Sequence, residues 1–145
     1  MRKAILGLVL ATGVTGAACA GDYVVVGSTD PSVRPGLELN AGQRVALSAG
    51  QTLRLINASG EVTTLRGGPE GAVAPRAGAP ADPTRLAQFR MLIDPPPTSK
   101  TFGGRRSGVC PDPATLVSLD QILVVQSGGC TTEAKAALDA YVAAH

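Results

Sequence analysis

Histidine and aromatic side chains are scarce in this sequence, and their scarcity excludes several kinds of active site. Among 145 residues there are one histidine, two tyrosines, two phenylalanines and no tryptophan. The histidine is His145, at a chain end, where fraying makes a poor general base or metal ligand. We therefore expect no Ser-His-Asp triad, and the G-x-S-x-G sequence of many hydrolases is missing. No pair of histidines or cysteines has zinc-ligand spacing.

Carboxylates are the remaining candidates for catalysis. Proline follows aspartate at four places, and such a proline favours a turn or a helix start over a catalytic role. These aspartates are Asp30, Asp82, Asp94 and Asp112. The competing hypothesis is a small hydrolase or lyase in which Asp112 or Asp120 meets Arg105 in a polar pocket. We predict instead that the protein is not an enzyme, with no catalytic, cofactor-binding or metal-binding residues and no cofactor.

Clustered positive charge is also scarce. The chain has 13 basic and 11 acidic side chains, and without Arg2 and Lys3 the two numbers are equal. Because nucleic-acid binding usually needs a clustered basic face, we expect no nucleic-acid partner. The exception is the segment 99–108, "SKTFGGRRSG", in which Lys100, Arg105 and Arg106 could contact an anion or a lipid headgroup. A solvated loop is the simpler interpretation, because three charges on a loop attract anions weakly.

Long apolar runs are missing after residue 20, so we expect no transmembrane span, which needs about 18 apolar residues or more. Residues 1–20 themselves have the order of an export signal. Arg2 and Lys3 precede the apolar run 4–14, and Ala18-Cys19-Ala20 matches a cleavage motif. The sequence therefore predicts a periplasmic or secreted protein whose signal peptide is cleaved after Ala20. A buried N-terminal helix is the alternative interpretation.

Cys19 offers a second processing route. Small residues before a cysteine are also typical of a bacterial lipoprotein signal, in which the cysteine becomes the lipid-carrying first residue. That signal prefers a leucine-like residue three positions earlier, where this chain has Gly16. A lipid anchor at Cys19 is therefore the less favoured alternative to cleavage after Ala20.

Residues 21–68 predict a β-rich domain. Val24, Val25 and Val26 suit a buried strand at 23–27. Glycine-led units then recur at 42–47 and 50–55, each with two apolar residues that alternate with polar ones, which is the period of a strand. The glycines between units are interpreted as turn residues at positive φ. A phosphate-binding loop is the rejected alternative, because it would need a helix directly after the glycines.

Residues 40–68, "NAGQRVALSAGQTLRLINASGEVTTLRGG", resemble the glycine-led strand repeats in the periplasmic domain of FecR-type signalling proteins. The resemblance covers residues 23–68, about a third of the chain. It implies a small β-meander in an exported envelope protein of proteobacteria, and it implies no activity. The sequence departs from that family because it has no N-terminal cytoplasmic segment and no membrane span, so transmembrane signalling is not implied.

The second half divides into a linker and a helical segment. Residues 69–81 are almost entirely Gly, Ala and Pro and are interpreted as a flexible linker. Residues 82–145 should contain a helix that begins at Asp82-Pro83 and a C-terminal helix capped by Thr131 or Thr132. Between them, Leu116 to Leu119 and Ile122 to Val125 suit strands, with a helix over 113–123 as the alternative.

Cys110 and Cys130 are predicted to form a disulfide. Export would remove Cys19 or convert it to a lipid anchor, which leaves an even pair in the chain. A redox-active or partner-linking pair is the alternative, although a separation of 20 residues is unlike a C-x-x-C centre.

These patterns together predict a mainly β, α+β fold. We expect a small antiparallel β-meander, then a linker, then a disulfide-linked half that contains helices. The expected function is that of a non-catalytic envelope protein, either structural or a protein-interaction module. Its partner would be another envelope protein bound through an exposed strand edge, since unpaired edges recruit strands.

Overall fold

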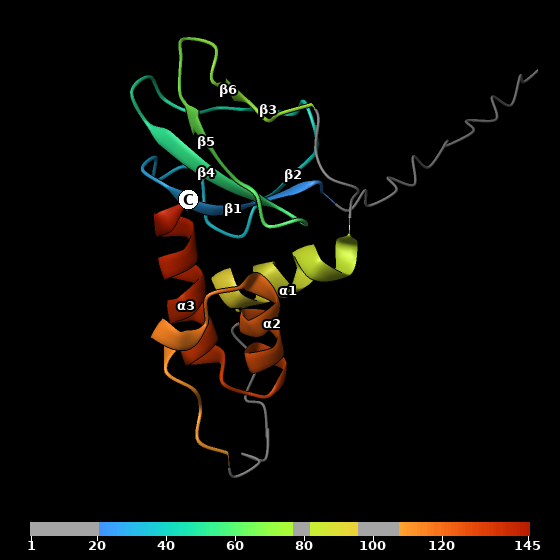
Figure 1. Ribbon diagram of the computed structural model, residues 1–145. Helices are drawn as coiled ribbons and strands as arrows, with labels where there is room; N and C mark the ends of the chain where they lie inside the picture. The colour runs from blue at the N-terminus through green and yellow to red at the C-terminus, as the bar shows by residue number, and fades with distance from the viewer. Residues whose placement is uncertain (1–20, 77–81, 96–107) are drawn as a thin grey trace, which may run out of the picture.

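The computed structural model describes residues 21–76, 82–95 and 108–145 (Figure 1). Their secondary structure confirms the expected α+β class, with one four-stranded antiparallel sheet, one two-stranded sheet and three α-helices. The strands are β1 (Tyr23–Ser28), β2 (Glu38–Leu39), β3 (Arg44–Val45), β4 (Thr52–Asn57), β5 (Val62–Arg66) and β6 (Ala72–Val73). The helices are α1 (Pro83–Ile93), α2 (Leu119–Ser127) and α3 (Thr131–Ala144), and a 3-10 turn spans Pro113–Thr115.

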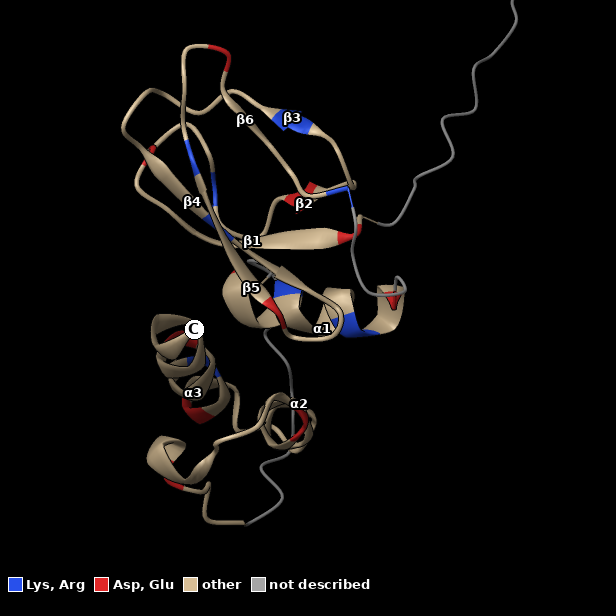
Figure 2. Cartoon of the chain, turned by 45° about the horizontal axis from the view of Figure 1, so that its top comes forward, with Lys and Arg blue, Asp and Glu red and all other residues tan. Residues whose placement is uncertain are grey.

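The four-stranded sheet lies between the helices on one face and the two-stranded sheet on the other (Figure 1 and Figure 2). Alternation along each strand divides its apolar side chains between two cores. Val24 and Ile56 face the helices and share a core with Phe89 of α1 and with apolar side chains of α2 and α3. Leu53 and Leu55 belong to the other core, with residues of β3 and β6. The two halves of the chain therefore pack as one unit.

The order of strands in the larger sheet is β2-β1-β4-β5, and every neighbouring pair is antiparallel. β3 and β4, which carry the two most similar glycine-led units, do not pair with each other, because β3 pairs with β6 in the second sheet. The repeats thus supply strands to both sheets. The turn interpretation of their glycines is confirmed at Gly50 and Gly60, whose φ angles are 83° and 90°.

The linker prediction for residues 69–81 is wrong for the part that the structure describes. Residues 72–73 form β6, and the side chains of Ala72 and Ala74 are buried. The backbone N–H of Ala74 donates to the Gln43 carbonyl at 2.9 Å, which continues the pairing with the β3 segment. Composition suggested a linker because small side chains bury little area each, but here backbone pairing and a close approach to the larger sheet hold the segment. Residues 77–81 lie outside the described ranges.

Helix α1 begins where the Asp82-Pro83 pair predicted. The Asp82 carboxylate accepts a hydrogen bond from the backbone N–H of Arg85 at 3.1 Å, as an N-cap residue does. One side of the helix packs against the sheet. Its buried side chains are Leu86, Phe89 and Leu92.

The strands predicted at residues 116–119 and 122–125 are wrong, because a helix occupies most of this segment. The Ser118 hydroxyl accepts from the backbone N–H of Gln121, and the Gln121 side chain accepts from the backbone N–H of Ser118. This reciprocal capping box favours a helix start strongly enough to override the β-branched residues that follow. The helical alternative was right in kind, but Asp112 caps only the 3-10 turn, through the backbone N–H of Ala114.

The predicted caps of the C-terminal helix, Thr131 and Thr132, lie inside α3. Cys130 occupies the N-cap position and its side chain makes no capping hydrogen bond.

The far end of α3 is attached to the sheet by two side-chain hydrogen bonds. The Arg54 guanidinium of β4 donates to the Val142 carbonyl at 2.9 Å, where a cation also complements the helix C-terminus. The Tyr141 hydroxyl donates to the Gly60 carbonyl at 3.1 Å. None of the helices in the described ranges has the length and hydropathy needed to cross a bilayer.

Candidate functional site

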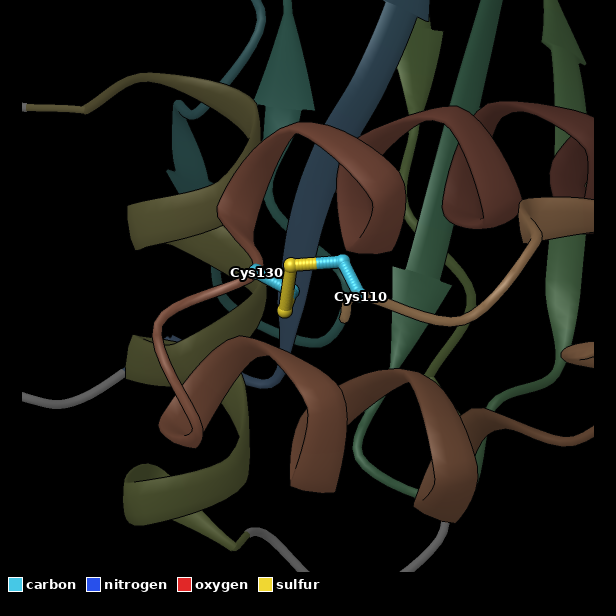
Figure 3. Close-up of a disulfide and its surroundings, with 2 residues drawn as sticks. All are labelled: Cys110 and Cys130. Atoms are coloured by element: carbon cyan, nitrogen blue, oxygen red, sulfur yellow. A yellow bond between two sulfur atoms is a disulfide. The ribbon is translucent and has the colours of Figure 1, made fainter. Parts of the chain in front are cut away.

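The predicted disulfide is present between Cys110 and Cys130, whose Cα atoms are 5.7 Å apart (Figure 3). It joins the segment that enters the 3-10 turn to the first residue before α3. Both cysteines are half-buried, so the bond lies at the surface of the helical layer. Its main effect is to fasten a connection that has little apolar area of its own.

Four of the residues singled out from the sequence cannot be placed. Lys100, Arg105 and Arg106, the candidate anion contacts, lie outside the described ranges, and so does Cys19, the alternative lipid-anchor residue. The anion contact and the anchor stay hypotheses.

Two of the carboxylates considered for catalysis, Asp82 and Asp120, line a common groove in the described part of the chain, and Asp112 lies elsewhere. Asp120 lines a groove of about 310 Å³ between α1 and α2, and its carboxylate pairs with Arg85 at 2.8 Å. Asp82 lines the same groove but caps α1. Asp112 caps the 3-10 turn and does not line the groove. The Asp120 side chain is 79 % exposed. We therefore interpret its contact with Arg85 as a surface ion pair that joins α1 and α2.

Asp30 is the described carboxylate most enclosed by hydrogen-bond donors. It is 5 % exposed, one oxygen accepts from the Ser32 hydroxyl at 2.6 Å and from the Ser32 N–H at 2.9 Å, and the other accepts from the Ser48 N–H at 3.0 Å. The Ser32 hydroxyl, followed by the backbone N–H groups of Ser48 and Ser32, lowers the pKa of Asp30 far below its ordinary value of 3.8. Both carboxylate oxygens thus accept hydrogen bonds from loop residues, so we interpret Asp30 as a structural residue that ties the turn after β1 to the turn before β4.

Replacing Asp30 by asparagine is expected to lower the melting temperature at pH 7 by about 5 °C. Asparagine keeps one oxygen for Ser32 but turns an NH2 group against the Ser48 N–H, so two donors face each other. Since folding lowers the pKa of Asp30, its stabilising contribution is complete above the unfolded pKa of about 3.8 and is lost progressively at lower pH. Melting curves between pH 7 and pH 3 should show the gap between parent and variant closing below about pH 4.

Asp112→Asn is the matched control for this comparison, because asparagine caps a helical turn about as well as aspartate. It should leave the melting temperature almost unchanged across the same pH range. A gap between the parent and Asp30→Asn that stays constant down to pH 3 would contradict the assignment.

The outer edge of β5 is the strongest candidate for a binding site. The pairs Asn57–Glu61 and Gln51–Gly67 are joined by backbone hydrogen bonds at both ends of the β4–β5 ladder. Bonded residues alternate along an antiparallel ladder, so Thr63 and Leu65 also direct their backbone groups to β4. The remaining residues of the strand, Val62, Thr64 and Arg66, direct theirs away from the sheet. No described strand of the larger sheet pairs with that side.

The opposite edge of the larger sheet is a poorer candidate. β2 is only two residues long, and its Glu38 carboxylate pairs with Arg90 of α1 at 3.1 Å. In β5, by contrast, Thr64 and Arg66 are exposed, and neither forms an ion pair with a residue of the described helices. Sequence reasoning predicted an exposed edge without saying which one. No local pattern in the sequence marks β5 as that edge, because the strand order decides it.

No protein-family model, curated protein or solved structure matches this chain. The resemblance of residues 23–68 to FecR-type repeats therefore stays a hypothesis.

Proposed function

We propose that this chain is an exported, non-catalytic interaction module of the bacterial envelope that binds another envelope protein by strand addition at β5. The observation that carries the proposal is the outward-facing backbone of Val62, Thr64 and Arg66. Three residues with both N–H and C=O directed outward can form a ladder with an extended segment of a partner. Such a segment would gain affinity from main-chain bonds and specificity from alternate side chains.

The surroundings of β5 suit a strand as the ligand. An added strand would place one set of side chains near Val62, which packs against the helical core, and the other near Leu65, which packs against the core between the sheets. Apolar residues at alternate positions of the partner would therefore extend both cores. Arg66 is exposed at one end of the edge and favours an acidic residue of the partner there.

The proposed location rests on the cysteines and on residues 1–20. The Cys110–Cys130 bond supports an oxidising compartment, because disulfides persist there and are rare in the cytosol. Cleavage after Ala20 would release a chain that begins at Gly21, just before β1. The resemblance to FecR-type repeats suggests the same compartment and a partner in the envelope.

Thr64→Pro is expected to abolish partner binding and to leave the fold intact. Proline removes an N–H that points outward, so the β4–β5 ladder loses no bond. Capture of partners by mild crosslinking in the envelope fraction, followed by mass spectrometry, should fall by about tenfold or more, as the loss of 1.4 kcal/mol of binding free energy requires. The same spectra should identify Gly21 as the first residue of the recovered chain.

Thr64→Val is the control, since it keeps the N–H and the β-branched shape at the same position. It should retain the partners, and both variants should melt within a few degrees of the parent. Equal capture by the parent and by a folded Thr64→Pro variant would refute strand addition at β5. A chain recovered with Met1 intact would refute export but not the edge.

A further inference from the structure

A carboxylate lies beside the two sulfur atoms of the disulfide. The Sγ atoms of Cys110 and Cys130 and a carboxylate oxygen of Glu133 all lie within 4.8 Å of one another. Each of the three residues is half-buried, so the cluster is open to small solutes. Figure 3 shows the two sulfurs at the start of α3, beside the incoming segment that carries Cys110.

The helix itself fixes Glu133 at this place. Cys130 is the N-cap residue of α3 and Glu133 lies in its first turn, three positions later. In a capping box the side chain at each of these two positions bonds the backbone N–H of the other, so both side chains lie at the same end of the helix. Unlike the Ser118 hydroxyl in α2, the Cys130 sulfur makes no bond to the helix backbone. Two of the three groups are thus held together by a 14-residue helix.

Reduction would turn this cluster into a set of metal ligands. A trialkylphosphine and one water molecule convert the disulfide into two thiols and a phosphine oxide, and each thiol loses its proton when it binds a metal. Zinc bonded tetrahedrally to two thiolates at 2.3 Å holds the sulfurs about 3.8 Å apart. The Cys110 side chain can make that movement, because the segment around it is not helical and its neighbour Val109 is fully exposed.

We propose that the dithiol form of this chain binds Zn²⁺ through Cys110, Cys130 and Glu133, with water as the fourth ligand. Thiolates select zinc over magnesium or calcium, and a carboxylate completes a ligand set with one open position. The same sulfurs cannot be bonded to each other and to the metal. Zinc and the disulfide therefore define two exclusive states of the chain, and the oxidised state shown in Figure 3 has no affinity for the metal at this site.

Titration of Zn²⁺ into the full chain, in competition with a chromophoric chelator, tests the proposal. The phosphine-reduced parent should bind one equivalent, and the oxidised parent should bind none. Glu133→Gln should weaken binding by about tenfold or more, since even the loss of a partner outside the ligand set costs that much. Asp139→Asn is the control: it removes one charge from the same helix, at a residue paired with Lys135, and should bind as the parent does. Co²⁺ in place of zinc should give a thiolate charge-transfer band.

Either of two binding results would overturn the proposal. One is equal affinity of the reduced parent and reduced Glu133→Gln for Zn²⁺, and the other is a Co²⁺ spectrum without thiolate bands. If reduction alone removes helical circular dichroism, Zn²⁺ must restore it in the parent at lower concentration than in Glu133→Gln. A reduced chain that stays unfolded with excess Zn²⁺ would also refute the site. Oxidised Glu133→Gln, which should melt as the parent does, shows that the substitution itself leaves the fold unchanged.

Discussion

Gly60→Val is expected to lower the free energy of unfolding by about 3 kcal/mol, from backbone strain of about 1–2 kcal/mol and overpacking of about 1–3 kcal/mol. The φ angle of Gly60 is 90°, in the left-handed region that side chains rarely adopt. A Cβ atom there would collide with Cδ1 of Leu119 and lie 3.5 Å from the Tyr141 hydroxyl. The turn between β4 and β5 would have to move away from the helices. Urea denaturation of parent and variant measures the loss directly.

Gly50→Val separates the two causes of that loss. The φ angle of Gly50 is 83°, but no atom outside its immediate neighbours lies within 4 Å of a Cβ added there. Backbone strain alone should therefore cost about 1–2 kcal/mol. Equal losses at the two positions would mean that the side chain added at Gly60 is accommodated beside Leu119 without a cost from overpacking.

Removing the disulfide is expected to lower the free energy of unfolding by about as much as Gly60→Val does. Cys110 and Cys130 are separated by 20 residues. Closing a loop of that length lowers the entropy of the unfolded chain, which raises the free energy of the unfolded state by about 3 kcal/mol in the chain-entropy model. The double variant Cys110→Ser/Cys130→Ser should therefore unfold at clearly lower urea concentration than the parent. Reduction of the parent in the presence of a chelator should produce the same shift, because both treatments remove the same bond.

Cys19→Ser is the control for this experiment, because export is predicted to remove Cys19 from the mature chain. It should leave the urea midpoint of the exported protein unchanged. A parent whose midpoint is the same with and without reductant would show that the bond is not formed in solution, and two free thiols in the denatured, unreduced chain would show the same.

Local signals in the sequence predicted the elements that are specified locally. The Asp82-Pro83 pair located the start of α1 because a cap and a helix-compatible φ act within one turn. Alternation identified Leu53 and Leu55 as one buried face of β4. Counting cysteines identified the disulfide, because only one pairing is left if export removes Cys19, as predicted.

Elements that depend on distant contacts were missed. β6 is two residues long and exists because it pairs with β3, about thirty residues earlier in the sequence. The burial of Asp30 was hidden for the same reason, since its partner Ser48 belongs to another turn. The start of α2 was missed for a different reason: Ser118 and Gln121 form a local capping-box signal, but the β-branched residues that follow favour a strand.

In the candidate site, too, some features could be predicted from the local sequence and others depend on distant contacts. An exposed edge could be expected from any open sheet, but the choice of β5 follows from the strand order, which the sequence does not specify. Glu133 near the sulfurs follows from the exact first residue of α3, which was predicted one or two positions too late. A correct N-cap at Cys130 would have placed both ligands on one turn.

The bond from Arg54 to the Val142 carbonyl joins residues 88 positions apart, and this separation has a consequence for the order of events in folding. The sheet face that carries Val24 and Ile56 is covered by helices encoded in the second half of the chain. While the chain emerges from a ribosome with its N-terminus first, α1 alone can cover part of that face until α2 and α3 appear. We therefore expect native structure to form only after synthesis of almost the whole chain, and such long-range closure is slow. During that interval we expect the apolar strands to be exposed to association with other chains.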